Sequence, residues 1–117
     1  MKTELYKVVN LEMPVEYLIG KSAQDNFDCI DIGAPDDIWF HIKDVPSCHV
    51  IAKISEQSKL DKKITQTIVK HGALLCKQNS KYKSSSNVEI IYTKLSNVTK
   101  SEPVGSVIAE NTKTIMI

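Results

Sequence analysis

The amino-acid sequence predicts an α+β fold: a single domain with a mostly antiparallel sheet and one long helix packed on it. The chain has 117 residues, which is enough for one modest core and leaves no room for a second domain. Short apolar-polar alternations recur along it, and one proline-free stretch is long enough for a main helix. With 42% hydrophobic and 25% charged residues, the composition excludes a disordered or repetitive chain. We therefore predict one domain over residues 1–117.

The N-terminal part is predicted to form two strands and a short helix. Residues 6–11 and 15–20 are typical of strands, and Pro14 suits the turn between them. Ser22 is a candidate N-cap for a short polar turn or helix, which Gly33 would end. The remaining predicted elements are strands at 38–43 and 48–54, the main helix from 60 to about 80, a strand at 88–93, and a closing hairpin formed by 107–109 and 114–117.

The strand at 38–43 alternates in a way that predicts two different faces. Ile38, Phe40 and Ile42 share one face, which is apolar and belongs in the core. Matching this face to the next strand pairs Phe40 with Ala52 and His41 with Ile51. The opposite face then collects one carboxylate, one aromatic ring, two imidazoles and two ammonium groups. Its members are Asp37, Trp39, His41, Lys43, His49 and Lys53.

Such a face suits single-stranded or looped RNA. An aromatic ring such as Trp39 can stack on an unpaired base, imidazoles can donate to base edges or phosphates, and lysines neutralise the backbone. A structural interpretation stands beside this one. Trp39 can equally be a core residue, and Asp37 can fix the tautomer of His41 or cap a turn.

An enzymatic interpretation uses the same residues. Asp37, His41 and His49 could ligate a metal, or His41 could act as a general base oriented by Asp37. No nucleophile elbow, phosphate-binding loop or HExxH motif accompanies them. We therefore expect no catalysis, no metal site and no cofactor.

The predicted main helix carries a stripe of lysines opposite its apolar face. Ile64, Ile68, Val69, Gly72, Leu75 and Cys76 fall on one arc and would pack on the sheet. The opposite side holds Lys62, Lys63, Lys70, Lys77 and Lys81, with Lys59 at its start. Asp61 is the only acidic residue in this stretch, whereas an ordinary solvated helix face mixes both signs. The stripe would run roughly 30 Å, long enough to follow several phosphates.

The net charge of +1 hides an uneven distribution. Residues 1–58 hold 5 lysines against 10 acidic residues, whereas residues 59–117 hold 10 lysines against 4. Near-neutrality is therefore an average over an acidic half and a basic half, and it does not exclude nucleic acid. All 15 basic residues are lysine. Because lysine lacks the planar fork of arginine, we expect contacts to the backbone and weak sequence specificity.

The three cysteines, Cys29, Cys48 and Cys76, are widely spaced and form no CxxC pair. This pattern predicts neither a disulfide scaffold nor a zinc ribbon, and it favours a reducing compartment. The sequence has no secretion signal at its start and no apolar run of membrane-spanning length. We therefore expect a soluble cytoplasmic protein that does not bind membranes; its oligomeric state does not follow from the sequence.

The motifs resemble the NFACT-R family, the RNA-binding module of ribosome-quality-control NFACT proteins, which also occurs as standalone proteins. The most specific parts are residues 37–41 (DIWFH) and 46–50 (PSCHV). Gly20 and Lys21, followed by Asn26, match a further element of the family. Residues 79–80, 88–93, 98–100, 105–107 and 113–117 resemble later elements in the same order.

The resemblance implies a standalone α+β domain that binds tRNA or rRNA, with the ribosome as a further candidate partner. One departure is Ser47, because the family usually has glycine after the proline, and this alters the expected turn. Two alternatives remain open: a protein-interaction or adaptor domain, and an RNA-processing enzyme that uses Asp37, His41 and His49.

Overall fold

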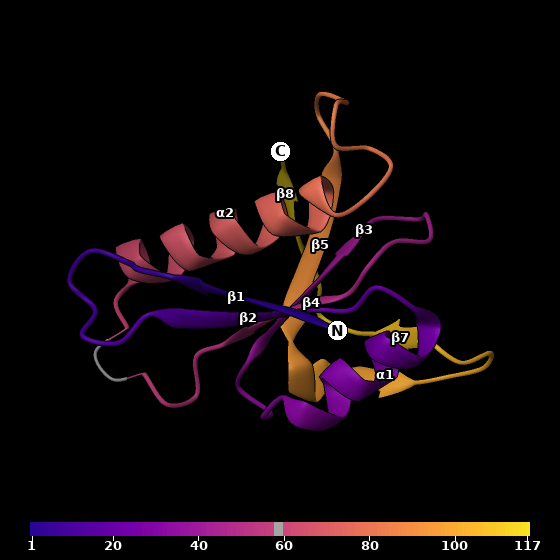
Figure 1. Ribbon diagram of the computed structural model, residues 1–117, viewed down its shortest axis with the longest axis horizontal. Coiled ribbons are helices and arrows are strands. Elements are labelled where there is room, and N and C mark those ends of the chain that lie inside the picture. Colours follow the sequence, from indigo (N-terminus) through magenta and orange to yellow (C-terminus); the bar gives the residue numbers. More distant parts are fainter. Residues whose placement is uncertain (58–59) are drawn as a thin grey trace.

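The fold was examined in a computed structural model that describes residues 1–57 and 60–117 (Figure 1). Within these residues the elements are β1 (Lys2–Tyr6), β2 (Val15–Ile19), α1 (Ala23–Ile32), β3 (Ile38–Ile42), β4 (Val50–Lys53), α2 (Lys62–Gln78), β5 (Glu89–Lys94), the 3-10 helix η1 (Leu95–Asn97), β6 (Val98–Lys100), β7 (Val107–Ala109) and β8 (Lys113–Met116). Six strands form one sheet in the order β1-β2-β4-β3-β5-β8, and every neighbouring pair is antiparallel. The predicted α+β class is confirmed.

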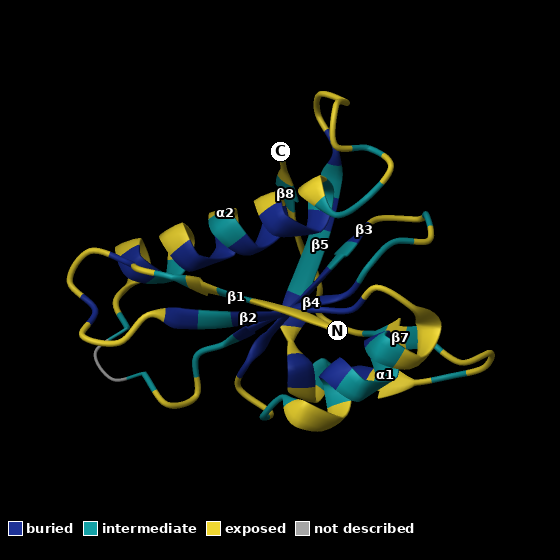
Figure 2. Ribbon diagram, viewed as in Figure 1, coloured by how far each residue is buried: buried dark blue, intermediate teal, exposed yellow. Residues whose placement is uncertain are grey.

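Helix α2 covers one face of this sheet and builds the larger core. The side of α2 that faces the strands is buried along its length, as Figure 2 shows. Gly72 lies directly against the Phe40 ring, and a Cβ atom there would come within 2.3 Å of Phe40 Cζ. The Tyr17 hydroxyl donates a hydrogen bond to the Ile68 carbonyl over 2.9 Å. The predicted apolar arc of the main helix is therefore its buried face.

The other face of the sheet is covered too, by α1 and by the small sheet of β6 and β7 (Figure 1). A second core forms there from six buried residues: Leu18, Cys29, Trp39, Ile51, Leu95 and Val98. Because both faces of the large sheet are packed, alternate residues of β3 enter two different cores. This arrangement decides which polar residues of β3 can reach a ligand.

Both helices begin at the residues that side-chain capping requires. The Ser22 hydroxyl accepts the Asp25 N–H over 3.1 Å, as predicted for the N-cap of α1. Asp61 does the same for α2, accepting the Ile64 N–H over 2.7 Å. These bonds satisfy backbone donors that the first helical turn leaves without partners.

Two predicted elements at the chain ends are wrong. The first strand is β1, whereas the strand predicted at residues 6–11 does not form. This segment contains a turn, in which the Leu11 N–H donates to the Val8 carbonyl over 3.1 Å. Val8 and Leu11 are apolar because they enter the core from this turn. The predicted closing hairpin does not form, since β7 pairs with β6 and β8 pairs with β5.

The predicted register between β3 and β4 is also wrong, by two residues. Phe40 lies opposite Val50, whereas matching of the faces had paired it with Ala52. Side-chain alternation has a period of two, so it assigns each residue to a face but cannot distinguish registers two residues apart. The same shift places His41 level with His49, and their ring centroids are 5.1 Å apart.

Candidate nucleic-acid interface

Asp37 is a structural residue just before β3. It is 0% exposed, and its carboxylate accepts three backbone N–H groups: Ala34 over 2.7 Å, Ile54 over 2.8 Å and Ser55 over 3.0 Å. These bonds give both carboxylate oxygens hydrogen-bond donors and tie the start of β3 to the end of β4. Of the alternatives left open, the turn-capping one is confirmed. Both carboxylate oxygens of Asp37 are engaged by backbone N–H groups, and no hydrogen bond joins Asp37 to His41 among the described residues.

Trp39 belongs to the second core. The residue is 1% exposed, and its indole Nε1–H donates to His49 Nδ1 over 3.2 Å. A base cannot stack on a ring that α1 and the small sheet already cover. Trp39 also lines the hollow described below, but its 1% exposure favours the structural interpretation over an exposed stacking platform.

His41 covers the edge of this buried cluster and is half-buried itself. Its ring lies nearly parallel to that of Trp39, with centroids 5.6 Å apart and 7° between the planes. His41 Nδ1 lies 2.6 Å from the Ile42 carbonyl, which only accepts, so this nitrogen carries the proton. Burial lowers the pKa of His41 below its ordinary value. The ring is therefore neutral at pH 7, and its Nε2 is a hydrogen-bond acceptor.

His49 has the opposite tautomer, fixed by its partner. Because the indole of Trp39 can only donate, His49 Nδ1 must be the acceptor and Nε2 carries the proton. Burial, followed by the proximity of His41, lowers the pKa of His49 to about 3. Among the described residues, no side-chain nitrogen or oxygen is sealed from solvent without a hydrogen-bond partner. The Nε2–H of His49 therefore reaches solvent, although the residue is only 2% exposed.

Solvent reaches the two imidazoles through a hollow of about 850 Å³. Its other lining residues come from the start of α1, the segment between β3 and β4, the end of α2, and β7 with the loop before it, together with Trp39 of β3 and Ile91 of β5. The hollow thus combines an acceptor on His41 with a donor on His49, and Lys21 and Asn79 stand among its walls. This is the site at which the described residues could hold a small planar polar group.

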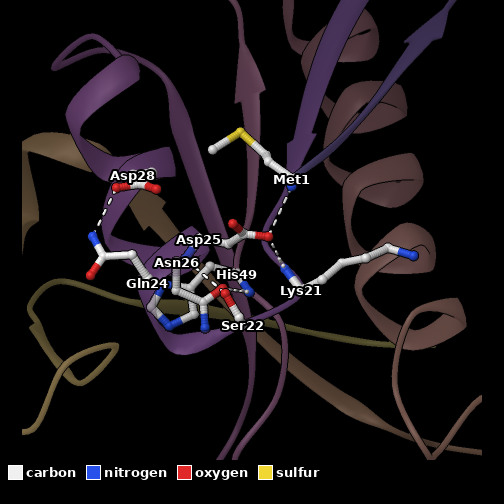
Figure 3. A network of polar contacts seen from close by, with 8 residues as sticks. All are labelled: Met1, Lys21, Ser22, Gln24, Asp25, Asn26, Asp28 and His49. Carbon is white, nitrogen blue, oxygen red and sulfur yellow. Dashed lines mark hydrogen bonds and ion pairs between the residues drawn. The ribbon is translucent and has the colours of Figure 1, made fainter.

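The Gly20, Lys21 and Asn26 element builds the wall of this hollow. Asn26 reaches from α1 to the β4 side, where its Oδ1 accepts the His49 N–H over 3.1 Å (Figure 3). A Cβ atom on Gly20 would lie 2.2 Å from the same oxygen, so only glycine fits there. The Gly20 N–H in turn donates to the His49 carbonyl over 2.9 Å. Gly20 and Asn26 therefore position His49, and Lys21 is the exposed member of the element.

Lys43 and Lys53 do not join the two histidines. Lys43 forms an ion pair with Glu89 over 3.4 Å, and Lys53 forms one with Glu16 over 3.6 Å. Neither lines the hollow. The predicted cluster on one strand face is thus divided: two members are buried in the core, two histidines line the hollow, and two lysines are ion-paired.

The lysines of α2 lie on the outer side of that helix, across the sheet from His41. We call Lys62, Lys63, Lys70 and Lys77 of α2, together with Lys81 in the turn that follows the helix, the lysine surface; Lys59 of the predicted stripe lies outside the described residues. Four of the five are exposed, and Lys77 is half-buried, with its Nζ donating to the Ile117 carbonyl over 3.2 Å. Within residues 1–57 and 60–117, none of the five has a carboxylate within 4.0 Å.

The C-terminal end of α2 reaches the hollow, although none of the five lysines lines it. Asn79, the C-cap residue of this helix, lines the hollow. The sequence did not predict this hollow, because its lining is assembled from several segments that are far apart in the chain. The only local signal was the resemblance of residues 79–80 to a family element. No group of three His, Cys, Asp or Glu side chains among the described residues could hold a metal ion, and none of the described helices is long and apolar enough to cross a membrane.

Comparison with a solved structure first defines the class of domain. The C-terminal part of the fibronectin/fibrinogen-binding protein from Streptococcus suis superposes with a TM-score of 0.78. The match covers 100% of this chain and 46% of that chain, at 22% sequence identity. At this identity the likeness shows the fold alone.

The sequence comparison then identifies the family. Residues 7–115 match the NFACT protein RNA binding domain, and the chain belongs to this family. The Rqc2 homolog RqcH from Bacillus subtilis is 38% identical over 84 residues, which is 71% of this chain and 14% of that protein. Coiled-coil domain-containing protein 25 from Mus musculus is 35% identical over 83 residues, which is 70% of this chain and 39% of that protein. The resemblance predicted from the motifs is confirmed, and the chain spans less than half the length of these relatives.

Proposed function

We propose that this chain is a non-enzymatic RNA-binding module and that the lysine surface of α2 contacts the RNA backbone. The observation that carries the proposal is the absence of carboxylate partners at these lysines in the described part of the chain. Lys2, Lys43, Lys53, Lys94 and Lys100 each have a carboxylate within 4.0 Å; the remaining described lysines also lack one, but they do not share a helix face. Membership of the family of RNA binding domains supports the same function.

The spacing of the lysine surface suits a polyanion. Lys63, Lys70 and Lys77 are one heptad apart, so successive ammonium groups are separated by about 10 Å along α2. Unpaired positive charges on one helix face repel one another, and a phosphate chain relieves this repulsion while releasing counterions. Because a lysine ammonium is a point charge, these contacts follow the backbone without reading the sequence.

The hollow supports a second contact, to an unpaired base. The acceptor Nε2 of His41 and the donor Nε2–H of His49 can pair with a base edge that offers one donor and one acceptor. Every base has such an edge, so this contact adds affinity with weak sequence specificity. An RNA strand that follows α2 toward its C-terminal end would arrive at this hollow.

The expected RNA is tRNA or rRNA, with the ribosome as a further candidate partner in the cytoplasm. Similarity to the Rqc2 homolog RqcH supports a role in ribosome quality control. The chain covers 14% of that protein, so the proposal concerns RNA binding by this domain and not the activity of the whole relative.

The lysine surface is tested by a triple variant, Lys63→Gln, Lys70→Gln and Lys81→Gln, whose affinity for tRNA is measured over a range of salt concentrations. We expect weaker binding and a salt slope reduced by about 2 to 3, since each lost phosphate contact removes about 0.7 to 0.9. The matched control replaces the ion-paired Lys2, Lys94 and Lys100 with glutamine and changes the net charge equally. Equal slopes for the two variants would refute the assignment of the footprint to α2.

A further inference from the structure

Two cysteines from distant parts of the chain meet at the end of α2. Cys48 precedes β4, and Cys76 lies in the last turns of α2. The Cys48 Sγ lies 3.6 Å from the Cys76 carbonyl oxygen, and the Cys76 Sγ lies 3.7 Å from the Cys48 carbonyl oxygen. These reciprocal contacts hold the two residues side by side. Cys29 is buried in the second core, on the other face of the sheet.

The two thiols differ in access. Cys48 is half-buried and is one of the residues that line the hollow, so a reagent that enters the hollow reaches Cys48 before Cys76. Cys76 is 0% exposed and lies behind it, among the apolar residues beneath α2. One thiol can therefore be reached from solvent, and the other can be reached only through the first.

The two thiols also differ in acidity. Interaction with the neighbouring Cys76 side chain lowers the pKa of Cys48 below its ordinary value. The same interaction, together with burial, raises the pKa of Cys76. Since the thiolate is the attacking form of cysteine, the accessible thiol is also the more reactive one. Burial raises the pKa of Cys29 to about 11, which makes that thiol inert.

We propose that Cys48 and Cys76 form a thiol–disulfide exchange site that accepts a low-molecular-weight disulfide of the glutathione type. The Cys48 thiolate attacks one sulfur of the reagent, forms a mixed disulfide and releases the first reduced thiol. Cys76 then loses its proton, attacks the Cys48 sulfur and expels the second reduced thiol. Two cysteine thiols are thereby oxidised to one internal disulfide, and one reagent disulfide is reduced to two thiols.

The hollow is the path by which the reagent would reach Cys48, and the new disulfide would tie the hollow to α2. A hollow of about 850 Å³ has room for the reagent beside Cys48. The new bond would join the residue before His49 to the residue before Lys77, so it links the hollow covalently to α2. It closes a loop across 28 sequence positions, which restricts the unfolded chain and raises the melting temperature.

The wild-type chain provides the first test. Folded, reduced protein is incubated with oxidised glutathione, blocked with N-ethylmaleimide and cut after lysine. The three cysteines then fall in separate peptides: residues 22–43, 44–53 and 71–77. We expect a crosslink between peptides 44–53 and 71–77 that dithiothreitol fully reverses. Before blocking, the intact mass should be lower than that of the reduced protein by two hydrogen atoms. A crosslink to peptide 22–43, or no change in mass, would overturn the proposal.

Single variants separate the two roles. Cys76→Ser should accumulate a stable glutathione adduct on Cys48, because the resolving thiol is gone, whereas Cys48→Ser should take up none. Cys29→Ser is the matched control and should form the same crosslink as the wild type. Pulse labelling of the native wild-type chain with N-ethylmaleimide does not depend on how the variants fold. It should modify Cys48 first, and earlier labelling of Cys76 would contradict the proposed order.

Discussion

Replacement of Trp39 distinguishes a core residue from a binding residue. Trp39→Ala removes a 1% exposed side chain from the second core, and large-to-small changes of this kind cost about 3–5 kcal/mol. It also leaves His49 Nδ1 without the indole donor, which adds about 1–3 kcal/mol if no water replaces it. Small domains are stable by about 5–15 kcal/mol, so the variant should be severely destabilised or unfolded.

Urea denaturation followed by circular dichroism measures this loss, and tRNA binding is measured on the same samples. His41→Ala is the companion variant, because His41 is half-buried and its Nε2 faces the hollow solvent rather than a protein partner. We expect His41→Ala to keep the free energy of unfolding within about 1.5 kcal/mol of the wild type and to weaken RNA binding. A Trp39→Ala chain that keeps its stability and loses only RNA affinity would refute the structural assignment of Trp39.

Two further predictions concern the packing of α2 and the buried histidine. Gly72→Ala should destabilise the chain by about 1–3 kcal/mol in urea, because the new Cβ meets the fully buried Phe40 ring at 2.3 Å; a more stable variant would show that the ring moves aside. The pKa of His49 is about 3 in the folded chain and about 6.5 in an unfolded one. Between these two pH values, His49 therefore takes up a proton when the chain unfolds. The free energy of unfolding should therefore fall as pH drops through this range, by up to about 1.4 kcal/mol per pH unit. Urea midpoints measured between neutral and acidic pH test this, and His49→Gln should flatten the dependence; an equally steep fall in that variant would assign it to other groups.

Local patterns in the sequence were enough to predict the fold class, the start of α1 and the buried face of α2. Ser22 caps its helix through a bond to a residue three positions away, and the apolar arc around Gly72 repeats with the helical period. The motifs at 37–41 and 46–50 were likewise enough to indicate the family. Each of these features depends on neighbours along the chain, so periodicity and short motifs contain the necessary information.

Whether Trp39 faces solvent or a core was decided only by the tertiary structure. Alternation along β3 separated Trp39 from Phe40, but α1 and the small sheet of β6 and β7 cover the Trp39 face with a core that includes residues as distant as Val98. The same holds for the register of β4, since a period of two cannot detect a shift of two residues. The hollow and the meeting of Cys48 with Cys76 also arise from segments that only folding brings together. The amino-acid sequence by itself therefore determined the polar and charged groups of this domain, and the packing of both sheet faces decided which of them can meet RNA.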